Sequence, residues 1–501
     1  MGRAHHKPPS RAARGRKPPC VRKAAFALLD AQPEASAGAS LAVPRALILG
    51  PGVFAAGLAL AAPGAVLTGL AGALTVYVAL VSALRLAAAI TPLRWSPRRR
   101  LARSELPVMT VIVALYREAK VAAALSACLS RLDYPRERLQ ILFALEACDT
   151  ETVKAARSIA RRSAITALVL PESGPRTKPR ALNYALQAAS GDLIAVYDAE
   201  DAPHPEQLRA AAEAFAADDR LAVVQAPLNW YNGGQNWLTR QFALEYAAQF
   251  HAVLPLLVRL GAPLPLGGTS NVFRRDRLEA AGGWDPFNVT EDADLGFRLA
   301  RKGWRAGVIA PGTGEEAPVT VRAWTAQRSR WLKGHLISWL VQMRDPRGLA
   351  EAAGWRALAS LQLTLLANVL SAGLHGPGLA LLAVALIAEG LGAGPAQAAA
   401  LFGLFAYLCA MACAASGAAR AGVPARGVDI AAMPAYWLLQ APALMRALRE
   451  LVTAPYFWAK TRHGVSTARR EAPHDTASHD RGYGADGRPV HAGGLAVGQT
   501  G

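Results

Sequence analysis

Residues 193–201 have the sequence LIAVYDAED, in which five apolar or aromatic residues run directly into a group of carboxylates. The apolar run predicts a short buried β-strand, and Asp198, Glu200 and Asp201 would lie just beyond its carboxyl end. Burying three carboxylates in this way carries a desolvation cost. A divalent cation is the usual compensation, because Mg²⁺ and Mn²⁺ prefer oxygen ligands. An acidic loop that leads into a capped helix at Pro205 is the alternative interpretation.

The sequence on both sides of this strand alternates short apolar runs with stretches of helical spacing. The expected strands are 108–114, 139–144, 166–170 and 193–197, and the expected helices between them include 117–131 and 150–162. Strands that alternate with amphipathic helices predict an α/β fold with a mostly parallel, doubly wound sheet. We expect this domain to cover residues 105–325, with its ligands beyond the carboxyl ends of the strands.

Long apolar segments flank the expected domain. No charged residue lies between Arg45 and Arg85, a stretch that as one helix would measure roughly 58 Å and so exceed a bilayer core. With a turn at Pro63-Gly64, residues 41–90 predict two transmembrane helices. Residues 354–450 predict three or four more, depending on whether His375-Gly-Pro-Gly splits the first apolar run. Residues 326–345 predict an amphipathic interface helix, and residues 1–40 and 455–501 predict disordered cytoplasmic tails.

Composition supports a membrane protein. Hydrophobic residues make up 52% of the chain, charged residues 18%, and the mean hydropathy is +0.18. The net charge of +19 is concentrated beside the apolar segments, with eight Lys or Arg between Arg3 and Lys23. That placement favours the positive-inside rule and anionic lipids over nucleic acid as the partner. The five cysteines show no spacing typical of a zinc site or a disulfide framework.

Two further motifs carry residues suited to chemistry. In Thr290-Glu-Asp292, Asp292 is a candidate general base, although carboxylates at a helix start are often caps. In Gln327-Arg-Ser-Arg330-Trp331, the arginine offers a fork for phosphate and the tryptophan a flat surface for a sugar ring. An interfacial helix with lipid-facing arginine and tryptophan is the alternative for this second motif.

Taken together and in this order, four segments resemble the family 2 membrane glycosyltransferases, the group of bacterial cellulose synthase and hyaluronan synthase. They are Ala114-Leu-Tyr-Arg-Glu118, Asp198-Ala-Glu200, Thr290-Glu-Asp292 and Gln327-x-x-Arg330-Trp331. The resemblance covers about residues 105–345 and implies a GT-A fold and an inverting, metal-dependent sugar transfer. The sequence departs from the family at Glu200, where a second aspartate is usual, so either Glu200 or Asp201 could share the Mg²⁺ or Mn²⁺ with Asp198.

The resemblance also implies roles for individual residues. Asp292 would be the catalytic base on the acceptor hydroxyl. The residues implied in donor binding are Glu146, Asp149, Lys178, Asp198 and Arg330. The residues implied in acceptor binding are Gly268, Thr269, Gln327 and Trp331.

The leading hypothesis is therefore a hexosyltransferase that moves a sugar, with a UDP-sugar as the first donor to test, onto a growing polysaccharide. A non-processive glycolipid glycosyltransferase is the alternative, and a non-catalytic membrane scaffold on a transferase fold is a third possibility. The expected location is the inner (cytoplasmic) membrane, multi-pass, with a cytosolic catalytic domain. The expected partners are a nucleotide-sugar donor, a glycan or lipid acceptor, membrane lipids and accessory export or assembly subunits.

Overall fold

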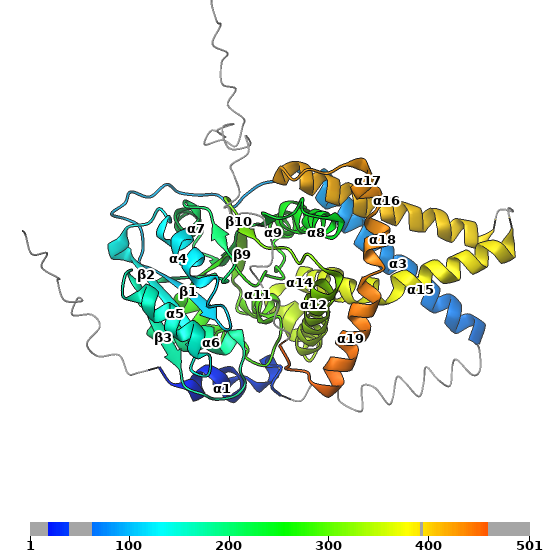
Figure 1. Ribbon diagram of the computed structural model, residues 1–501. Helices are drawn as coiled ribbons and strands as arrows, with labels where there is room; N and C mark the ends of the chain where they lie inside the picture. Colours follow the sequence, from blue (N-terminus) through cyan, green and yellow to red (C-terminus); the bar gives the residue numbers. More distant parts are fainter. Residues whose placement is uncertain (1–18, 40–62, 391–393, 459–501) are drawn as a thin grey trace, which may run out of the picture.

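The computed structural model describes residues 19–39, 63–390 and 394–458, and its centre is a seven-stranded sheet in the order β3-β2-β1-β4-β8-β6-β9 (Figure 1). β8 runs antiparallel to both of its neighbours, and the other pairs are parallel. The predicted mostly parallel α/β sheet is confirmed. Its strands are β1 (Met109–Leu115), β2 (Leu139–Glu146), β3 (Ile165–Leu170), β4 (Leu193–Tyr197), β6 (Leu221–Gln225), β8 (Asn271–Arg274) and β9 (Arg305–Val308). A smaller sheet contains β5 (Ala202–Pro203), β10 (Thr313–Glu315) and β7 (Leu228–Trp230).

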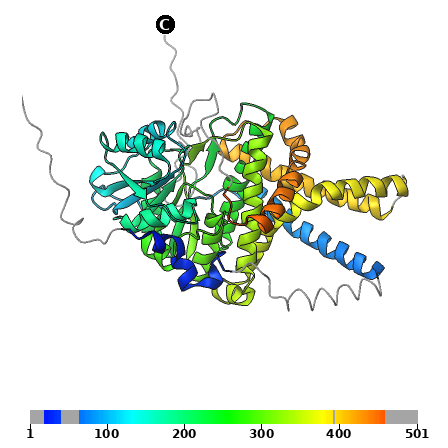
Figure 2. The same cartoon turned by 60° about the horizontal axis from the view of Figure 1, so that its bottom comes forward.

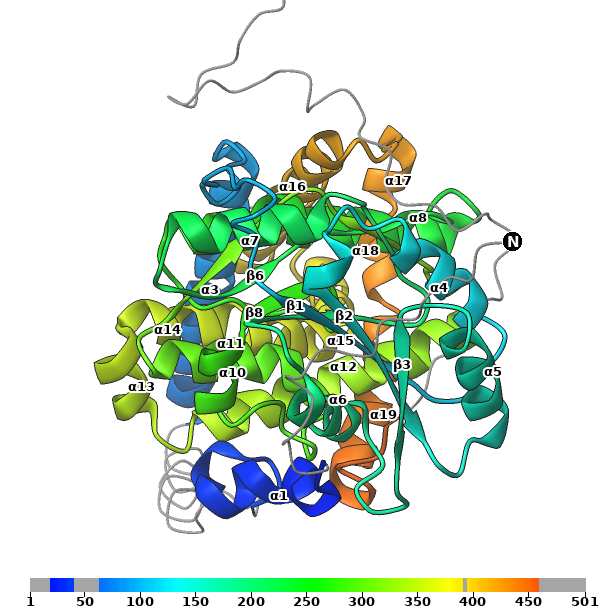
Figure 3. The ribbon, with the colours of Figure 1, turned by 90° about the vertical axis from the view of Figure 1, so that its left-hand side faces the viewer.

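Helices cover both faces of the large sheet because alternate strand residues point to opposite sides. Val111 and Val113 pack in a core with α4 (Ala122–Ser130), α5 (Thr150–Ala160) and α7 (Gln207–Ala217). Ile112 packs on the other face with α6 (Lys178–Ala188), α9 (Leu254–Arg259) and α11 (Glu291–Arg301). Figure 3 shows α4 and α7 on one side of the strands and α6 and α11 on the other.

Further helices lie between these strands in the chain or follow them. They are η3 (Arg136–Arg138), α8 (Trp237–Ala248), the π-helical turn η4 (Gln249–Val253), α10 (Arg275–Ala280), α12 (Val321–Gln342) and α13 (Pro346–Ala353). α12 contains the segment expected to be an interface helix, but eleven of its residues are buried. It packs against α11 and against α19 (Gln440–Thr453). The helix therefore forms a wall between the sheet domain and the apolar helices.

Three helices in the described part of the chain are long and apolar enough to cross a membrane. They are 64–90 within α3 (Pro63–Ile90), 355–389 and α16 (Pro395–Ala421). Residues 355–389 comprise α14 (Trp355–Leu361), the π-helical turn η5 (Gln362–Leu366) and α15 (Ala367–Glu389). Figures 1 and 2 show α3, α15 and α16 extending from the side of the molecule opposite β2 and β3.

The C-terminal half differs from the expected three or four spans. α15 continues through Pro377, so His375-Gly-Pro-Gly does not divide it. The third apolar run forms short helices instead of a span, α17 (Gly427–Ala431), α18 (Met433–Trp437) and the start of α19. The buried Asp429 carboxylate explains part of this, because it pairs with Arg240 at 3.0 Å and Arg426 at 2.7 Å and so ties the run to α8. Two long C-terminal helices still return the chain to the domain side.

Arg420 holds the end of α16 beside the end of α3. Its guanidinium donates hydrogen bonds to the backbone oxygens of Ala88, Ala89 and Thr91, at 2.6–3.0 Å, and to His251 oxygen at 3.1 Å. These bonds satisfy carbonyl groups at the end of α3, which an isolated helix end leaves unpaired. Arg420 therefore lies beside the sheet domain, on the same side as the end of α3. The first predicted span, before Pro63, lies outside the described residues.

The N-terminal segment also differs from the expected disordered tail. Residues 21–31 form helix α1 (Val21–Ala31), followed by η2 (Pro33–Ala35), while residues 1–18 lie outside the described part. Asp285 accepts hydrogen bonds from Ser36 Oγ at 3.0 Å and Ala37 N at 2.6 Å. Arg344 donates to the carbonyl oxygens of residues 33, 34 and 36. The composition of this segment predicted disorder. The segment is ordered because it binds residues that are far away in the sequence.

We expect Asp285→Ala to release residues 19–39 from the domain, because Ser36 and Ala37 lose a buried acceptor. The loss should lower the free energy of unfolding by about 1–3 kcal/mol. Hydrogen exchange of the α1 amides in the detergent-solubilised protein should speed up with it. Asp219→Ala is the matched control, because the Asp219 side chain is 97% exposed. Unchanged α1 exchange in Asp285→Ala would show that other contacts hold the segment.

Candidate active site

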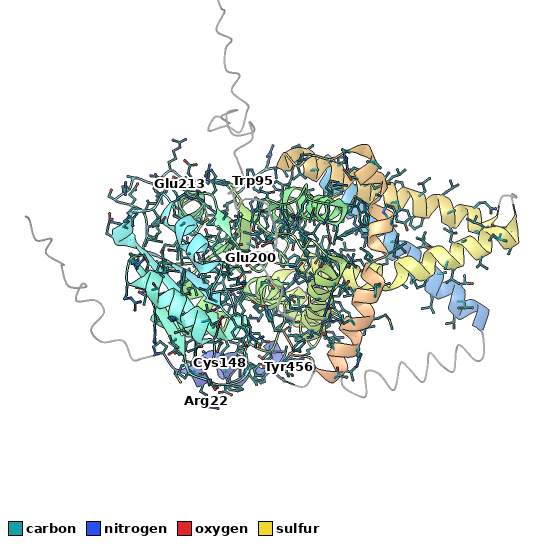
Figure 4. All side chains as sticks on the ribbon, viewed as in Figure 1. Arg22, Trp95, Cys148, Glu200, Glu213 and Tyr456 are labelled. Atoms are coloured by element: carbon teal, nitrogen blue, oxygen red, sulfur yellow. The ribbon has the colours of Figure 1, made fainter. Side chains whose placement is uncertain are left out.

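A cavity of about 810 Å³ lies where the sheet domain meets the apolar helices. One part of its wall is formed by residues at the carboxyl ends of β1, β2 and β4, and another by α12, α3, α15 and α16. Figure 4 shows Glu200, one of its wall residues, near the middle of the molecule between the strands and the helices. We call this space the central cavity. Its position agrees with the rule that α/β sheets bind ligands beyond the carboxyl ends of their strands.

Lys178, in the first turn of α6, joins two elements of the wall. Its Nζ forms an ion pair with Asp198 Oδ1 and donates to Gly268 oxygen at 2.7 Å. A Cβ atom on Gly268 would lie 3.3 Å from Asp292 Oδ2, so this loop passes directly beside Asp292. Burial alone would lower the pKa of Lys178, but the carboxylates of Asp198, Glu291 and Asp292 raise it above its usual value. Asp198 and Asp292 therefore both act on one cationic group.

The acidic residues after β4 take different positions. Asp198 and Glu200 line the central cavity, whereas Asp201 is fully buried behind them. Asp201 Oδ2 accepts hydrogen bonds from Asp198 N at 2.7 Å and from Thr269 Oγ1. Burial, and then the charges of Asp198 and Glu200, raise the pKa of Asp201 well above its usual value. Thr269, predicted to bind the acceptor, thus supports the turn, although it also contributes to the cavity wall.

Asp292 and Glu291 begin α11 at the cavity wall. Burial and the neighbouring Asp292 raise the pKa of Glu291 to about 8, and burial also raises the pKa of Asp292. Lys178 and Arg330 oppose both shifts. Thr290 fits closely against α12, because a Cβ on Gly334 would lie 2.4 Å from its side chain. A glycine at this position lets the two elements come together.

Gln327, Arg330 and Trp331 of α12 all line the central cavity. The Arg330 guanidinium carbon lies 4.7 Å from the centre of the Trp458 ring, a cation–π contact. Trp331 stacks on Phe242 with ring centres 5.9 Å apart. Gln327 Oε1 is buried and has no hydrogen-bond partner among the described residues. These three side chains therefore present one cation, one aromatic ring and one amide on the wall that faces the carboxylates.

The position of Trp331 depends on a buried network that sequence reasoning missed. Arg328 donates to both carboxylate oxygens of Glu245, at 2.7 and 2.6 Å, and Tyr436 Oη donates to the same carboxylate at 2.7 Å. The Arg328 guanidinium also lies 4.8 Å from the centre of the Trp331 ring. The pairing of Glu245 on α8 with Arg328 on α12 joins elements 83 residues apart, so no local pattern could indicate it.

The two donor residues predicted after β2 are arranged differently from each other. Glu146 is a wall residue of the central cavity, but its carboxylate is already paired with the buried Arg180. Asp149 is not among the wall residues; it caps α5 by accepting from Thr152 N at 3.2 Å and also accepts from Arg117 N. The cap accounts for Asp149 in structural terms. Its predicted contact with the donor stays a prediction.

Other wall residues were not predicted, among them Glu315, Arg85 and Arg176. Glu315 belongs to β10, a three-residue strand that gives almost no sequence signal. Arg85 is a single charged residue on a membrane-type helix. A lone charge in such a helix often marks a functional site, so the sequence alone could have indicated Arg85. Ala114, Tyr116 and Glu118 of the first motif also line the cavity, as expected for a segment at the carboxyl end of β1.

Comparison with known proteins agrees with this arrangement. Residues 107–334 match the family model described as "Glycosyltransferase like family 2". The chain carries a family 2 glycosyltransferase domain. The predicted resemblance to family 2 glycosyltransferases is thereby confirmed over this region. The matched region includes every predicted site residue from Glu146 to Trp331.

Individual relatives are similar over about half of the chain. Beta-monoglucosyldiacylglycerol synthase of Trichormus variabilis is 28% identical over 46% of this chain and 50% of its own length. Glucomannan 4-beta-mannosyltransferase 1 of Oryza sativa is 24% identical over 47% and 46%. The chain thus spans about half the length of these curated relatives. The solved mannosyltransferase PcManGT of Pyrobaculum calidifontis, in complex with GDP-Man and Mn²⁺, has a TM-score of 0.48 at 23% identity, over 75% of this chain and 99% of that chain.

The Glu245–Arg328 pair yields a stability prediction for this transferase domain. Glu245→Leu or Arg328→Met alone should cost about 3–5 kcal/mol, because each leaves a buried charge without its partner. The double variant should cost clearly less than the sum of the two single variants. Thermal unfolding of the solubilised protein measures all three. Asp30→Ala, which breaks the exposed pair with Arg22 at 3.4 Å, is the control and should cost at most about 1 kcal/mol. Additive losses would contradict a coupled pair.

Proposed function

We propose that this protein is a membrane-anchored glycosyltransferase that moves a sugar from a nucleotide-sugar donor onto an acceptor hydroxyl in the central cavity. One observation carries the proposal: Asp198, Asp292 and the Arg330–Trp331 face of α12 line a single cavity. The family 2 domain supports the same reaction class. We place the catalytic domain on the cytoplasmic face of the inner membrane, because basic residues such as Arg98, Arg99 and Arg100 follow α3 on the domain side.

The donor side of the proposal includes a divalent cation, Mg²⁺ or Mn²⁺. Glu315 lies close to the acidic residues after β4: burial first, and then Asp201, Glu200 and Asp198, raise its pKa well above the usual value. So much negative charge in one buried place favours a cation. Among the described residues, no group of three or more His, Cys, Asp or Glu is arranged as a metal site. We propose that Asp198 and Glu200 would hold the ion together with donor diphosphate oxygens, and that it would neutralise charge on the leaving diphosphate.

The chemical step uses the residues on the facing wall. Asp292 accepts the proton of the acceptor hydroxyl as its oxygen forms a bond to the anomeric carbon of the donor sugar. The bond from that carbon to the phosphate oxygen breaks on the opposite side, and its electron pair leaves with the nucleoside diphosphate. Lys178 and Arg330 stabilise the negative charge of the leaving group. Attack opposite to the leaving group inverts the configuration at the anomeric carbon.

Two acceptor classes fit this reaction, and we favour a lipid. The cavity continues from the carboxylates to apolar residues of α3, α15 and α16, among them Leu74, Leu382 and Phe402. Such a wall suits hydrocarbon chains and offers a growing polar glycan few hydrogen-bond partners. The similar glucosyldiacylglycerol synthase points the same way. Polysaccharide synthesis is the second candidate, favoured by the Gln327-x-x-Arg330-Trp331 motif and by the similar glucomannan mannosyltransferase.

One assay tests donor, metal and acceptor class together. Membranes that contain the protein are incubated with radiolabelled UDP- and GDP-sugars in Mn²⁺, Mg²⁺ or EDTA. We expect label in the solvent-extractable lipid fraction with at least one donor, loss of that label in EDTA, and recovery when Mn²⁺ is restored. Label in a long, solvent-insoluble product would support the polysaccharide candidate instead. Membranes without the protein are the control, and failure of every donor would contradict the proposed transfer.

Replacing the proposed base gives a sharper prediction. Asp292→Asn keeps the shape of the side chain but cannot accept the proton, so kcat should fall by about 10²- to 10⁴-fold. KM for the nucleotide sugar should change far less, because Asp292 does not hold the donor. Asp276→Asn is the matched control: this exposed aspartate also lies in the first turn of a helix, α10. An Asp292→Asn enzyme with more than half of the normal kcat would rule out the role of base.

A further inference from the structure

Arg85 is the one charged residue in the described part of α3, which is otherwise mostly apolar from Gly64 onward. Its side chain is a wall residue of the central cavity, and among the described residues it forms no hydrogen bond and no ion pair. An arginine inside a membrane-type helix is costly and usually faces a polar partner or a functional cavity. The partner of Arg85 is therefore to be sought in what the cavity binds.

The charges around Arg85 do not neutralise it. The carboxylate that acts electrostatically on Arg85 is Glu245. That carboxylate is already paired with Arg328 through two hydrogen bonds of 2.7 and 2.6 Å, and it accepts a third bond from Tyr436 Oη at 2.7 Å. The group of Arg85, Arg328 and Glu245 thus keeps one net positive charge. An anionic ligand group would compensate it, and a guanidinium fork matches a phosphate well.

The parts of the cavity wall that α3 and α15 contribute are largely apolar. Val78 and Val81 lie on α3 with Arg85, and Leu374 and Leu382 on α15 line the same space. The outer surfaces of these helices are also apolar and exposed, with Leu70 63% and Leu381 71% accessible. A ligand that satisfies both features has a phosphate beside hydrocarbon chains. A free phosphate ion would leave the apolar wall unused, and a neutral lipid would leave Arg85 unpaired.

We propose that Arg85 binds the phosphate of an acceptor phospholipid, whose acyl chains lie along α3 and α15 in the central cavity. This inference rests on the proposed function, since it names the class of lipid that receives the sugar. The lipid must also carry a free hydroxyl in its head group, because the hydroxyl oxygen forms the new glycosidic bond. Phosphatidylglycerol has this chemistry, with one phosphate and free hydroxyls, and diacylglycerol has the hydroxyl without the phosphate.

Binding of short-chain lipids tests the proposal without any sugar transfer. The full chain in an uncharged detergent is titrated with dioctanoyl phosphatidylglycerol or dioctanoylglycerol, and the Kd of each is measured. We expect the wild type to bind the anionic lipid at least about tenfold more tightly, the difference typical of one charge-assisted contact. Arg85→Gln should bring the two Kd values within about twofold. Its Kd for dioctanoylglycerol should stay unchanged, which also shows that the variant is folded.

Control measurements separate this site from other sources of affinity. Arg94→Gln removes an exposed arginine just beyond α3 and should keep the wild-type preference. Arg85→Lys keeps the charge and should keep most of it. Inorganic phosphate at millimolar concentration should not displace the lipid; displacement would overturn the lipid source in favour of a free anion. Equal affinity of the wild type for both lipids, or an unchanged preference in Arg85→Gln, would also overturn the proposal. Since no nucleotide sugar is present, these failures are distinct from a failure of sugar transfer.

Discussion

The contact of Lys178 with Asp198 and with the carbonyl oxygen of Gly268 is the constraint on which the site depends. It joins three segments that are distant in the chain: the start of α6, the end of β4 and the loop before β8. Asp292 lies against the same loop, so Lys178 and this loop link the carboxylate after β4 to the carboxylate of α11. Without a cation beside them, two carboxylates in the wall of one cavity would repel each other. One lysine thus allows both to face the same cavity.

The second constraint is the close fit of α12 between the sheet domain and the apolar helices. Arg328 and Lys333 are both buried in this helix, and each is paired with a glutamate from another helix, Glu245 and Glu450. Buried ion pairs of this kind add little net stability, but they penalise any arrangement in which a partner is displaced. They therefore fix the rotation of α12, and with it the direction in which Arg330 and Trp331 point.

The sequence predicted four of the seven strands of the large sheet, because β1, β2, β3 and β4 are continuous apolar runs. The run 193–197 was predicted with the bounds of β4, and the strands β1, β2 and β3 within one or two residues, whereas β6, β8 and β9 were not predicted. The residues that line the cavity were predicted where a motif placed them directly after a strand or at a helix start, as with Asp198 and Asp292. Glu315 and Glu245 were missed because Glu315 belongs to a very short strand and Glu245 to a helix that carries no recognisable motif. Both residues interact with side chains that are distant in the sequence, so no local sequence pattern indicates them.

The third apolar run of the C-terminal half folds differently from the sequence expectation, for a physical reason of the same kind. Residues 430–445 are apolar, but Asp429 pairs with two arginines and holds this run against α8, where it folds into short helices. Hydropathy measures the preference for lipid over water, and it does not register the alternative of packing against another part of the protein. At Pro377 the sequence suggested a break between two spans, but α15 continues through this proline, as membrane-type helices often do.

The two terminal segments of the described chain meet beside the loop that leads to Asp292. Tyr456 Oη donates to Ala37 oxygen at 3.1 Å, and the Phe287 ring packs against both Phe26 and Tyr456. Phe287 precedes Thr290-Glu-Asp292 by only a few residues, and Trp458 covers Arg330. A purification tag, a fluorescent fusion or a truncation that disturbs either segment would thus act on the proposed reaction centre. Fusion sites for labelling this molecule are better sought in the exposed loop after α7, around Asp219, which lies at the far end of the strands.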